Sequence, residues 1–319
     1  MLQILLVTFP FFALVLCGYA AARRGVLPQA AIPGLNTFVL YFALPCMLYR
    51  FGSTTPIAQL LNGATFGVYL LCALTMVAFT IAVTLSQRID WNNAAFGALV
   101  AAFPNTGFMG VPLLVALLGP AAAGPAIVTI VVDLVITTSL CIALSRLDAA
   151  DSAGARVAAK NALKGVISNP MPWAIMAGAV SSYFGLEPVQ PVMATLGMLA
   201  DAASPVALFT IGAVLARSQM TSTDPTPLVD YVPVAMKKLV LHPLLVLLVG
   251  SAAIAQGVPL DKFSLTVIVL VAALPSASNV SLLAERFGAN NGRIARIILV
   301  STALAFVTFS TAVHWLTGH

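Results

Sequence analysis

Charged residues are scarce in this chain. Lys, Arg, Asp and Glu make up only 8% of its 319 residues, whereas soluble domains carry roughly 25%. A water-soluble protein is therefore excluded. The sequence also lacks a hydrophilic stretch long enough to form a soluble domain, a nucleotide site or a regulatory tail.

Cysteine and catalytic motifs are also sparse. The four cysteines all fall in apolar stretches and form no CxxC pattern, so they are typical of small packing residues. The chain contains no HExxH, no paired membrane aspartates in a catalytic motif and no Ser/His dyad. We therefore expect neither an intramembrane enzyme nor a cofactor.

Apolar segments fill most of the chain instead. Hydrophobic residues account for 60% of it, and the mean hydropathy is +1.02. A membrane-spanning helix needs about 20 predominantly apolar residues. The sequence predicts an all-α membrane protein with ten spans, at residues 2–22, 32–51, 63–85, 94–118, 124–145, 172–184, 192–216, 234–255, 263–286 and 294–316.

The basic residues predict how these spans are oriented. Thirteen Lys and Arg fall on one side of the ten predicted spans and two, Arg50 and Lys262, on the other. Cytoplasmic loops carry the excess of positive charge, so both termini are predicted to lie outside the cytoplasm. The net charge of +5 reflects this bias, and we expect the lipid bilayer as a partner and no nucleic acid.

The ten spans divide into two halves, residues 1–146 and 170–319. Because five is odd, the two halves have opposite orientations, which predicts an inverted repeat. Residues 147–169 form the linker between them. Its basic residues Arg156, Lys160 and Lys164 recur every fourth position, which fits either an interfacial helix on the cytoplasmic leaflet or a solvated linker.

Two of the apolar segments, the fourth and the ninth, contain a break. Residues 101–114 read AAFPNTGFMGVPLL and residues 272–282 read AALPSASNVSL. Proline removes an N–H and pushes the preceding residue out of the helical region. The breaks should therefore free the carbonyls near Val100 and Val271. Irregular backbone at membrane depth survives only where it is buried in protein or lines a wet cavity.

Paired breaks in matching segments point to a transport site. The half-helix N-termini after each break expose N–H groups and partial positive charge, which favours an anion. Gly107 and Gly110 would let the two backbones cross closely. The predicted substrate-binding residues are Pro104, Asn105, Thr106, Gly107, Pro275, Ser276, Ala277, Ser278 and Asn279. The alternative is that proline and glycine merely kink two helices; two breaks in corresponding positions favour the site.

Asp133 is the most informative ionisable residue, because a carboxylate in the middle of a span is costly. It lies in the fifth span, with Thr129 one turn away on the same face. We expect it to reach the break at Asn105 and Thr106, where it would hold a sodium ion or a transported proton. The alternative is a structural hydrogen bond to a backbone N–H freed by the break.

The sequence is less informative about the roles of three further ionisable residues. Asp201, four residues before Pro205, either caps an irregular point or faces the cavity. His242 is a candidate proton relay or a structural hydrogen-bonding residue. Lys238 is expected to snorkel to the membrane interface.

The motifs identify a family. FPNTGFMGVPLL, followed by ALPSASNVSLLAERFGANNGRIARIILVSTALAF, resembles the auxin efflux carrier family, which includes plant auxin exporters and bacterial carriers assigned to malonate and related acids. The resemblance extends to LNTFVLYFALPCMLYRF, ISNPMPWAI, ASPVALFTIGAVLA and KKLVLHPLL, and so covers nearly the whole chain.

This resemblance implies a ten-helix carrier related in fold to the bile-acid sodium symporters. In such a carrier a core domain with two crossing broken helices moves against a scaffold domain in an elevator motion. By the motif, Pro104 and Asn105 match the first crossover and Pro275 the second. The long central loop of the plant members is missing, so their phosphorylation control is not expected.

We therefore predict a secondary active transporter of a small organic anion, with malonate-like carboxylates as the leading substrate class. An exporter of a hydrophobic organic acid, such as an indole carboxylate, is the alternative within the same class. A passive anion channel is a third hypothesis, and the lack of a continuous polar helix face argues against it. Coupling to sodium or to protons, and a homodimer, are left open.

Overall fold

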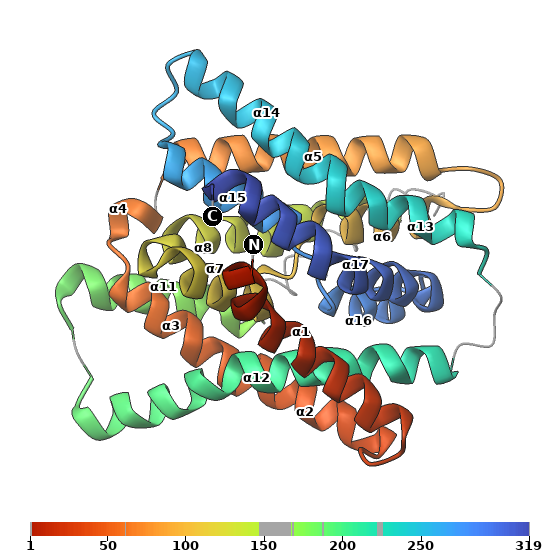
Figure 1. The fold of residues 1–319 in the computed structure, drawn as a ribbon, viewed down its shortest axis with the longest axis horizontal. Coiled ribbons are helices and arrows are strands. Elements are labelled where there is room, and N and C mark those ends of the chain that lie inside the picture. The colour runs from red at the N-terminus through yellow and green to blue at the C-terminus, as the bar shows by residue number, and fades with distance from the viewer. Residues whose placement is uncertain are drawn as a thin grey trace.

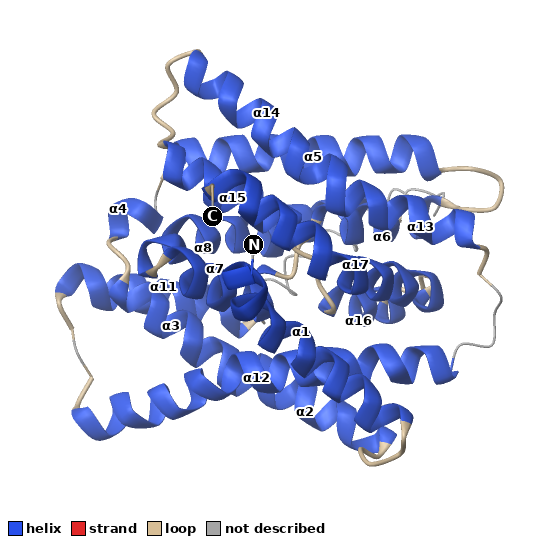
Figure 2. Cartoon of the chain, viewed as in Figure 1, coloured by secondary structure: helices blue, strands red, loops and turns tan. Residues whose placement is uncertain are grey.

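The computed structural model describes residues 2–60, 62–146, 167, 169–186, 188–221 and 226–318. In these residues the regular structure is helical, as predicted (Figure 2), and no strand occurs apart from two isolated bridges. Seven helices are long and apolar enough to cross a membrane. The basic triplet of the predicted interfacial helix, Arg156, Lys160 and Lys164, lies outside the described residues.

The first half of the chain contains five apolar segments. Several of them are divided by short 3-10 helices (tight turns) or π-helices (wide turns), which are labelled η. Its elements are α1 (Leu2–Arg23), η1 (Gln29–Ala31), α2 (Ile32–Phe38), η2 (Val39–Ala43), α3 (Leu44–Thr54), α4 (Ile57–Leu60), α5 (Gly63–Thr84), α6 (Trp91–Ala102), η3 (Thr106–Gly110), α7 (Val111–Leu118), η4 (Pro120–Ala122), α8 (Ala123–Val131), η5 (Val132–Thr137) and α9 (Thr138–Leu144).

The second half of the chain contains fewer and longer elements in its described residues. Its elements are α11 (Pro170–Phe184), α12 (Gln190–Thr221), α13 (Leu228–Met236), η6 (Lys237–Leu241), α14 (His242–Ala255), α15 (Lys262–Ala273), α16 (Asn279–Arg286) and α17 (Asn291–Thr317). Pro205 lies inside the continuous helix α12.

The helices pack as two groups. In one group α12 packs along α1 and α3, and α3 packs against α11. In the other, α5 packs against α6 and α14, α14 against α15, and α13 against α17. Figure 1 shows α1, α2, α3 and α12 along the lower side of the view and α5 and α14 along the upper side.

Glycine lets the helices of the first group approach to backbone contact. A Cβ on Gly18 would collide with the carbonyl of Phe209, and one on Gly212 would collide with the carbonyl of Val15. The α1–α12 pair therefore uses the small-residue packing that is typical of membrane helices, where close van der Waals contact replaces the hydrophobic effect.

The broken segments α6 and α15 share one local design. Each helix has 12 residues and begins after an aspartate whose carboxylate accepts a hydrogen bond from the backbone three residues on: Asp90 from the N–H of Asn93, and Asp261 from the N–H of Ser264, both at 2.8 Å. Such N-caps satisfy the free N–H groups of a helix start. Each helix then ends two residues before a proline, at Ala102 and Ala273.

Candidate functional site

The two predicted helix breaks are confirmed, and they cross each other. Pro104 and Ser276 form an isolated antiparallel bridge. The Asn105 N–H donates to the Pro275 carbonyl at 2.8 Å, and the Ala277 N–H donates to the Phe103 carbonyl at 2.9 Å. Residues 170 or more positions apart in the chain are therefore held together by backbone hydrogen bonds.

The crossing consumes some of the N–H groups that the sequence analysis assigned to an anion. Besides the N–H groups of Asn105 and Ala277, that of Ser276 is bound, because it donates to Ser301 Oγ at 3.2 Å. The N–H groups that donate to no group in the described part of the chain are those of Gly107 and Phe108 after the first break and of Ser278 and Asn279 after the second. The available N–H groups thus lie three and four residues after each proline.

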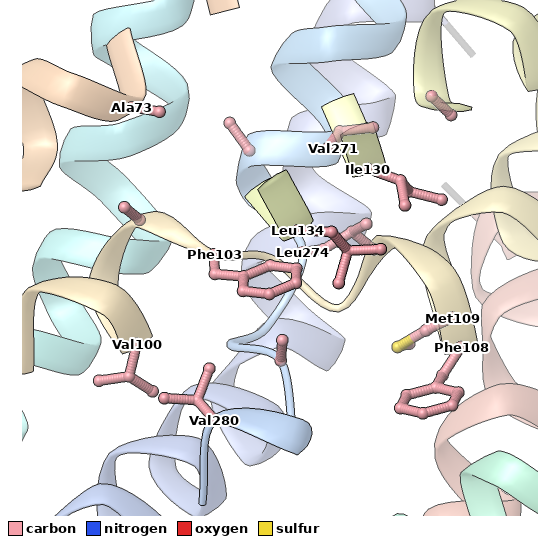
Figure 3. Packing of buried hydrophobic residues seen from close by; sticks show 14 of the residues in the cluster. Ala73, Val100, Phe103, Phe108, Met109, Ile130, Leu134, Val271, Leu274 and Val280 are labelled. Carbon is pink, nitrogen blue, oxygen red and sulfur yellow. The ribbon is translucent and has the colours of Figure 1, made fainter. Parts of the chain in front are cut away.

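A cavity adjoins the crossing, and we call it the crossing cavity. It encloses about 290 Å³ of empty space, including the part open to solvent. Its lining residues are Leu44, Phe103, Pro104, Asn105, Gly107, Phe108, Ile130, Leu134, Met171, Ala277 and Asn279. Asn105 and Asn279 thus meet at one cavity, one from each break, in an otherwise apolar wall. Figure 3 shows Phe103, Leu134 and Leu274 gathered where the two broken segments pass each other.

The other predicted substrate-binding residues have different positions. Ser278 lines a second cavity, together with Asn36 and Thr210, and Phe108 lines both cavities. Thr106, Pro275 and Ser276 line neither cavity. Both breaks are therefore where they were predicted. Of the predicted substrate-binding residues, some line a cavity and the others lie in the buried crossing.

The two glycines after the first break differ as well. A Cβ on Gly110 would lie 2.5 Å from Leu274 Cδ1, so Gly110 does allow the first segment to approach the second. A Cβ on Gly107 would meet only Leu44 Cδ2, at 3.8 Å. The prediction of a close approach is therefore right for Gly110 and wrong for Gly107.

The carbonyl freed by the second break is not the one predicted. The Val271 carbonyl accepts a hydrogen bond from the Leu274 N–H at 3.1 Å, whereas the Ala272 carbonyl accepts one from Lys238 Nζ at 2.6 Å. Lys238 is completely buried and does not snorkel. Its η6 turn is directed at α15, and this packing overrides the local preference of a lysine for the interface.

Asp133 lies in a buried hydrogen-bonded cluster beside the crossing. Its Oδ2 accepts from the Tyr69 hydroxyl at 2.9 Å and its Oδ1 from the Thr137 hydroxyl at 3.2 Å. Its neighbours Ile130 and Leu134 line the crossing cavity, but Asp133 does not. Asp133 forms no hydrogen bond with Asn105 in the described part of the chain, because its carboxylate faces Tyr69 and Thr137, and its role as the holder of a sodium ion or a transported proton stays a prediction.

The remaining predicted coupling residues are scattered. The Thr129 hydroxyl donates to the Ala126 carbonyl of its own helix at 2.7 Å and makes no bond to Asp133. Asp201 pairs with Arg50 at 2.6 Å, with 72% of its side chain exposed, and lines neither of the two cavities. His242 is buried, with its Nδ1 3.1 Å from Lys238 Nζ.

Sequence reasoning missed Tyr69 and Ser301 and misplaced Lys238. Tyr69 is completely buried in α5, and its ring centroid lies 6.0 Å from that of His242. A tyrosine in the middle of an apolar span is a usable signal, because a buried hydroxyl needs a hydrogen-bond partner. Ser301 had no such signal, since serine commonly bonds its own helix, as Ser301 also does to the Ile298 carbonyl.

Comparison with known families decides the class of protein. A family model described as "Membrane transport protein" matches residues 4–313. The chain belongs to this family. The match spans both helix breaks, both cavities, Asp133 and Lys238, so all of these lie within the region that matches the family.

Three relatives illustrate the breadth of the similarity. A protein of Rhizobium meliloti (strain 1021) named "Putative malonate transporter" is 29% identical over 313 residues, which cover 97% of this chain and 94% of the relative. "Uncharacterized transporter YfdV" of Escherichia coli (strain K12) is 27% identical over 319 residues, covering 96% and 95%. Auxin efflux carrier component 3a of Oryza sativa subsp. japonica is 28% identical over 147 residues, covering 44% of this chain and 24% of the relative.

Proposed function

We propose that this membrane transporter is a secondary active carrier of a small organic anion, which it binds in the crossing cavity. The observation that carries the proposal is the meeting of Asn105 and Asn279, from two oppositely running broken helices, in one cavity next to unbonded backbone N–H groups. Amide dipoles and half-helix N-termini hold a carboxylate without an intramembrane arginine. The Asn side chains add donors at the same depth.

Alternating access follows from the way the cavity is assembled. Leu44 and Met171 come from the α1–α3–α11–α12 group, and the other lining residues come from the group that contains both breaks. A rigid movement of the second group against the first would open the cavity to one side and then the other. This is an elevator-type motion, and it fits ten spans arranged as an inverted repeat, with both termini outside the cytoplasm of a bacterial inner membrane.

The substrate class has two candidates. Malonate-like carboxylates are favoured by the name of the Rhizobium relative. A monocarboxylate with an apolar body is favoured by the cavity, because its lining includes Phe103, Phe108 and Ile130 and no charged side chain. A second carboxylate would have to leave water without a charged partner, which is costly.

Uptake into proteoliposomes tests the site. Purified protein should exchange a labelled carboxylate against unlabelled internal substrate, and Asn105→Ala should abolish this exchange while the variant keeps its melting temperature. The matched control is Asn92→Ala, in the helix α6 that precedes the break, since Asn92 Nδ2 donates to the Phe287 carbonyl outside the cavity. This variant should exchange at the wild-type rate.

A competition series separates the two substrate candidates. Malonate is compared with monocarboxylates that carry progressively larger apolar groups, each tested as an inhibitor of exchange. Inhibition that strengthens with apolar size supports the hydrophobic acid, and inhibition by malonate alone supports the dicarboxylate. Exchange by Asn105→Ala at the wild-type rate would refute the proposed site for both.

A further inference from the structure

Lys238 occupies an unusual position for a lysine in a membrane protein. Its side chain is completely buried, and Nζ donates to the Ala272 carbonyl at 2.6 Å and lies 3.1 Å from His242 Nδ1. Buried charges in a membrane are rare, and they pair with one another or with backbone carbonyls. Lys238 therefore needs an explanation beyond packing.

The break after α15 explains why a cation is stabilised there. In a continuous helix the Ala272 carbonyl would accept the N–H of residue 276, but the Ser276 N–H donates to Ser301 Oγ instead. Ala272 belongs to the last turn of α15, where the helix dipole is negative. The ammonium group of Lys238 thus completes the helix end and meets its partial negative charge.

The charge of Lys238 has a counterpart in Asp133. Both groups are completely buried, but they form no direct ion pair in the described part of the chain. Tyr69 connects them, because its hydroxyl binds Asp133 while its ring packs against the ring of His242, the neighbour of Lys238. One acidic and one basic side chain thus share a closed cluster made by α5, η5, η6, α14 and α15.

We propose that the ammonium group of Lys238 is a built-in counter-cation. It occupies the position at the end of α15 where a sodium-coupled carrier would bind a sodium ion. Sodium is held by carbonyl and carboxylate oxygens, such as those that broken transporter helices supply. Here the Ala272 carbonyl is bound by Lys238, and both Asp133 oxygens are bound by hydroxyls. Transport by this chain therefore runs without sodium, a consequence that rests on the proposed function, whereas the cation site itself does not.

Thermal unfolding of the purified full-length protein in detergent tests the cation site without any substrate. The melting temperature is measured in sodium chloride and in choline chloride at equal ionic strength. Wild type should melt at the same temperature in both. Lys238→Ala removes the ammonium group and leaves space beside Ala272, so its melting temperature should rise with sodium concentration towards saturation, as expected for a bound ligand.

Lys238→Met is the matched control, because it removes the charge but fills the space. It should be less stable than wild type and should not respond to sodium. Sodium-dependent stabilisation of wild type would overturn the proposal, and so would a Lys238→Ala variant that melts identically in both salts.

A double variant keeps the proposal testable if the single variants fold poorly. Lys238→Met with Asp133→Asn leaves no uncompensated buried charge, so it should recover yield and melting temperature relative to Lys238→Met alone. A double variant no better than Lys238→Met would show that the two groups do not compensate each other, and would overturn the built-in counter-cation. These readouts use no substrate, so they stay informative even if the exchange assay refutes the crossing cavity.

Discussion

The break after α6 and the break after α15 begin alike and end differently. Each break follows a 12-residue helix that has an aspartate N-cap and that ends two residues before a proline. At the second break, side chains hold the backbone: Lys238 binds the Ala272 carbonyl and Ser301 binds the Ser276 N–H. At the first break, the residues from Phe103 to Phe108 have mostly backbone partners, and five of these six residues line the crossing cavity.

This difference indicates that the two breaks have different roles. The first break supplies most of the cavity wall that the crossing contributes, so its exposed atoms decide what can be bound. The second break contributes only Ala277 and Asn279 to that wall and is anchored to η6 by Lys238 and to α17 by Ser301 instead. We infer that the first break provides most of the substrate contacts, while the second adds Asn279 and ties the crossing to its surroundings.

The largest loss of stability is expected from a substitution at Gly110, where the first break contacts the second. Gly110→Val would place its new carbon atoms against Leu274 and Thr106, since even a Cβ would lie 2.5 Å from Leu274 Cδ1 and 3.3 Å from Thr106 Cγ2. Overpacking of this kind costs about 3 kcal/mol, the upper end of the usual range. The melting temperature in detergent should fall markedly.

Gly107→Ala is the control for this measurement. Its Cβ would meet only Leu44 Cδ2, at 3.8 Å, so its melting temperature should match that of wild type. Equal stability of Gly110→Val and wild type would mean that the two breaks are not in contact through this glycine.

A smaller effect is expected from Ser301, which anchors the second break. Ser301→Ala leaves the Ser276 N–H buried without its acceptor, which costs about 1–2 kcal/mol. Thr302→Val is the matched control, because the Thr302 hydroxyl donates only to the Ile298 carbonyl of its own helix, at 2.7 Å. Chemical or thermal unfolding should rank Ser301→Ala below Thr302→Val, and the reverse order would contradict the anchoring role of Ser301.

The breaks could be predicted from sequence because their cause is local. Pro104 and Pro275 have no N–H, and each is followed by polar or small residues, Asn-Thr-Gly and Ser-Ala-Ser, so the local sequence disfavours a helix there. Proline alone is not sufficient, because Pro205 lies inside the continuous helix α12. The apolar segments were predictable for the same reason, since the bilayer imposes their length and composition. Partners such as that of Ala272 were not, because Lys238 reaches it from 34 positions away through the packing of η6 against α15.

Asp133 shows where reasoning from periodicity fails. Thr129 and Thr137 lie four residues before and after it, so both share its helix face. The structure selects Thr137, within the wide turn η5, and adds Tyr69 from α5. Neither the wide turn nor the neighbouring helix follows from a spacing of four, so the partner and the direction of Asp133 required the tertiary structure.

The smallest effect is expected from Asp201, which lies at neither break. Asp201 pairs with Arg50 at 2.6 Å, but 72% of its side chain is exposed, and solvent weakens such pairs. Asp201→Asn should therefore change the free energy of unfolding by about 0.5 kcal/mol or less. Carboxylate exchange in proteoliposomes, measured with sodium and with choline outside, should keep its wild-type rate. A variant whose exchange slows or acquires an ion dependence would return Asp201 to the transport pathway, and the crossing cavity would no longer account for transport by itself.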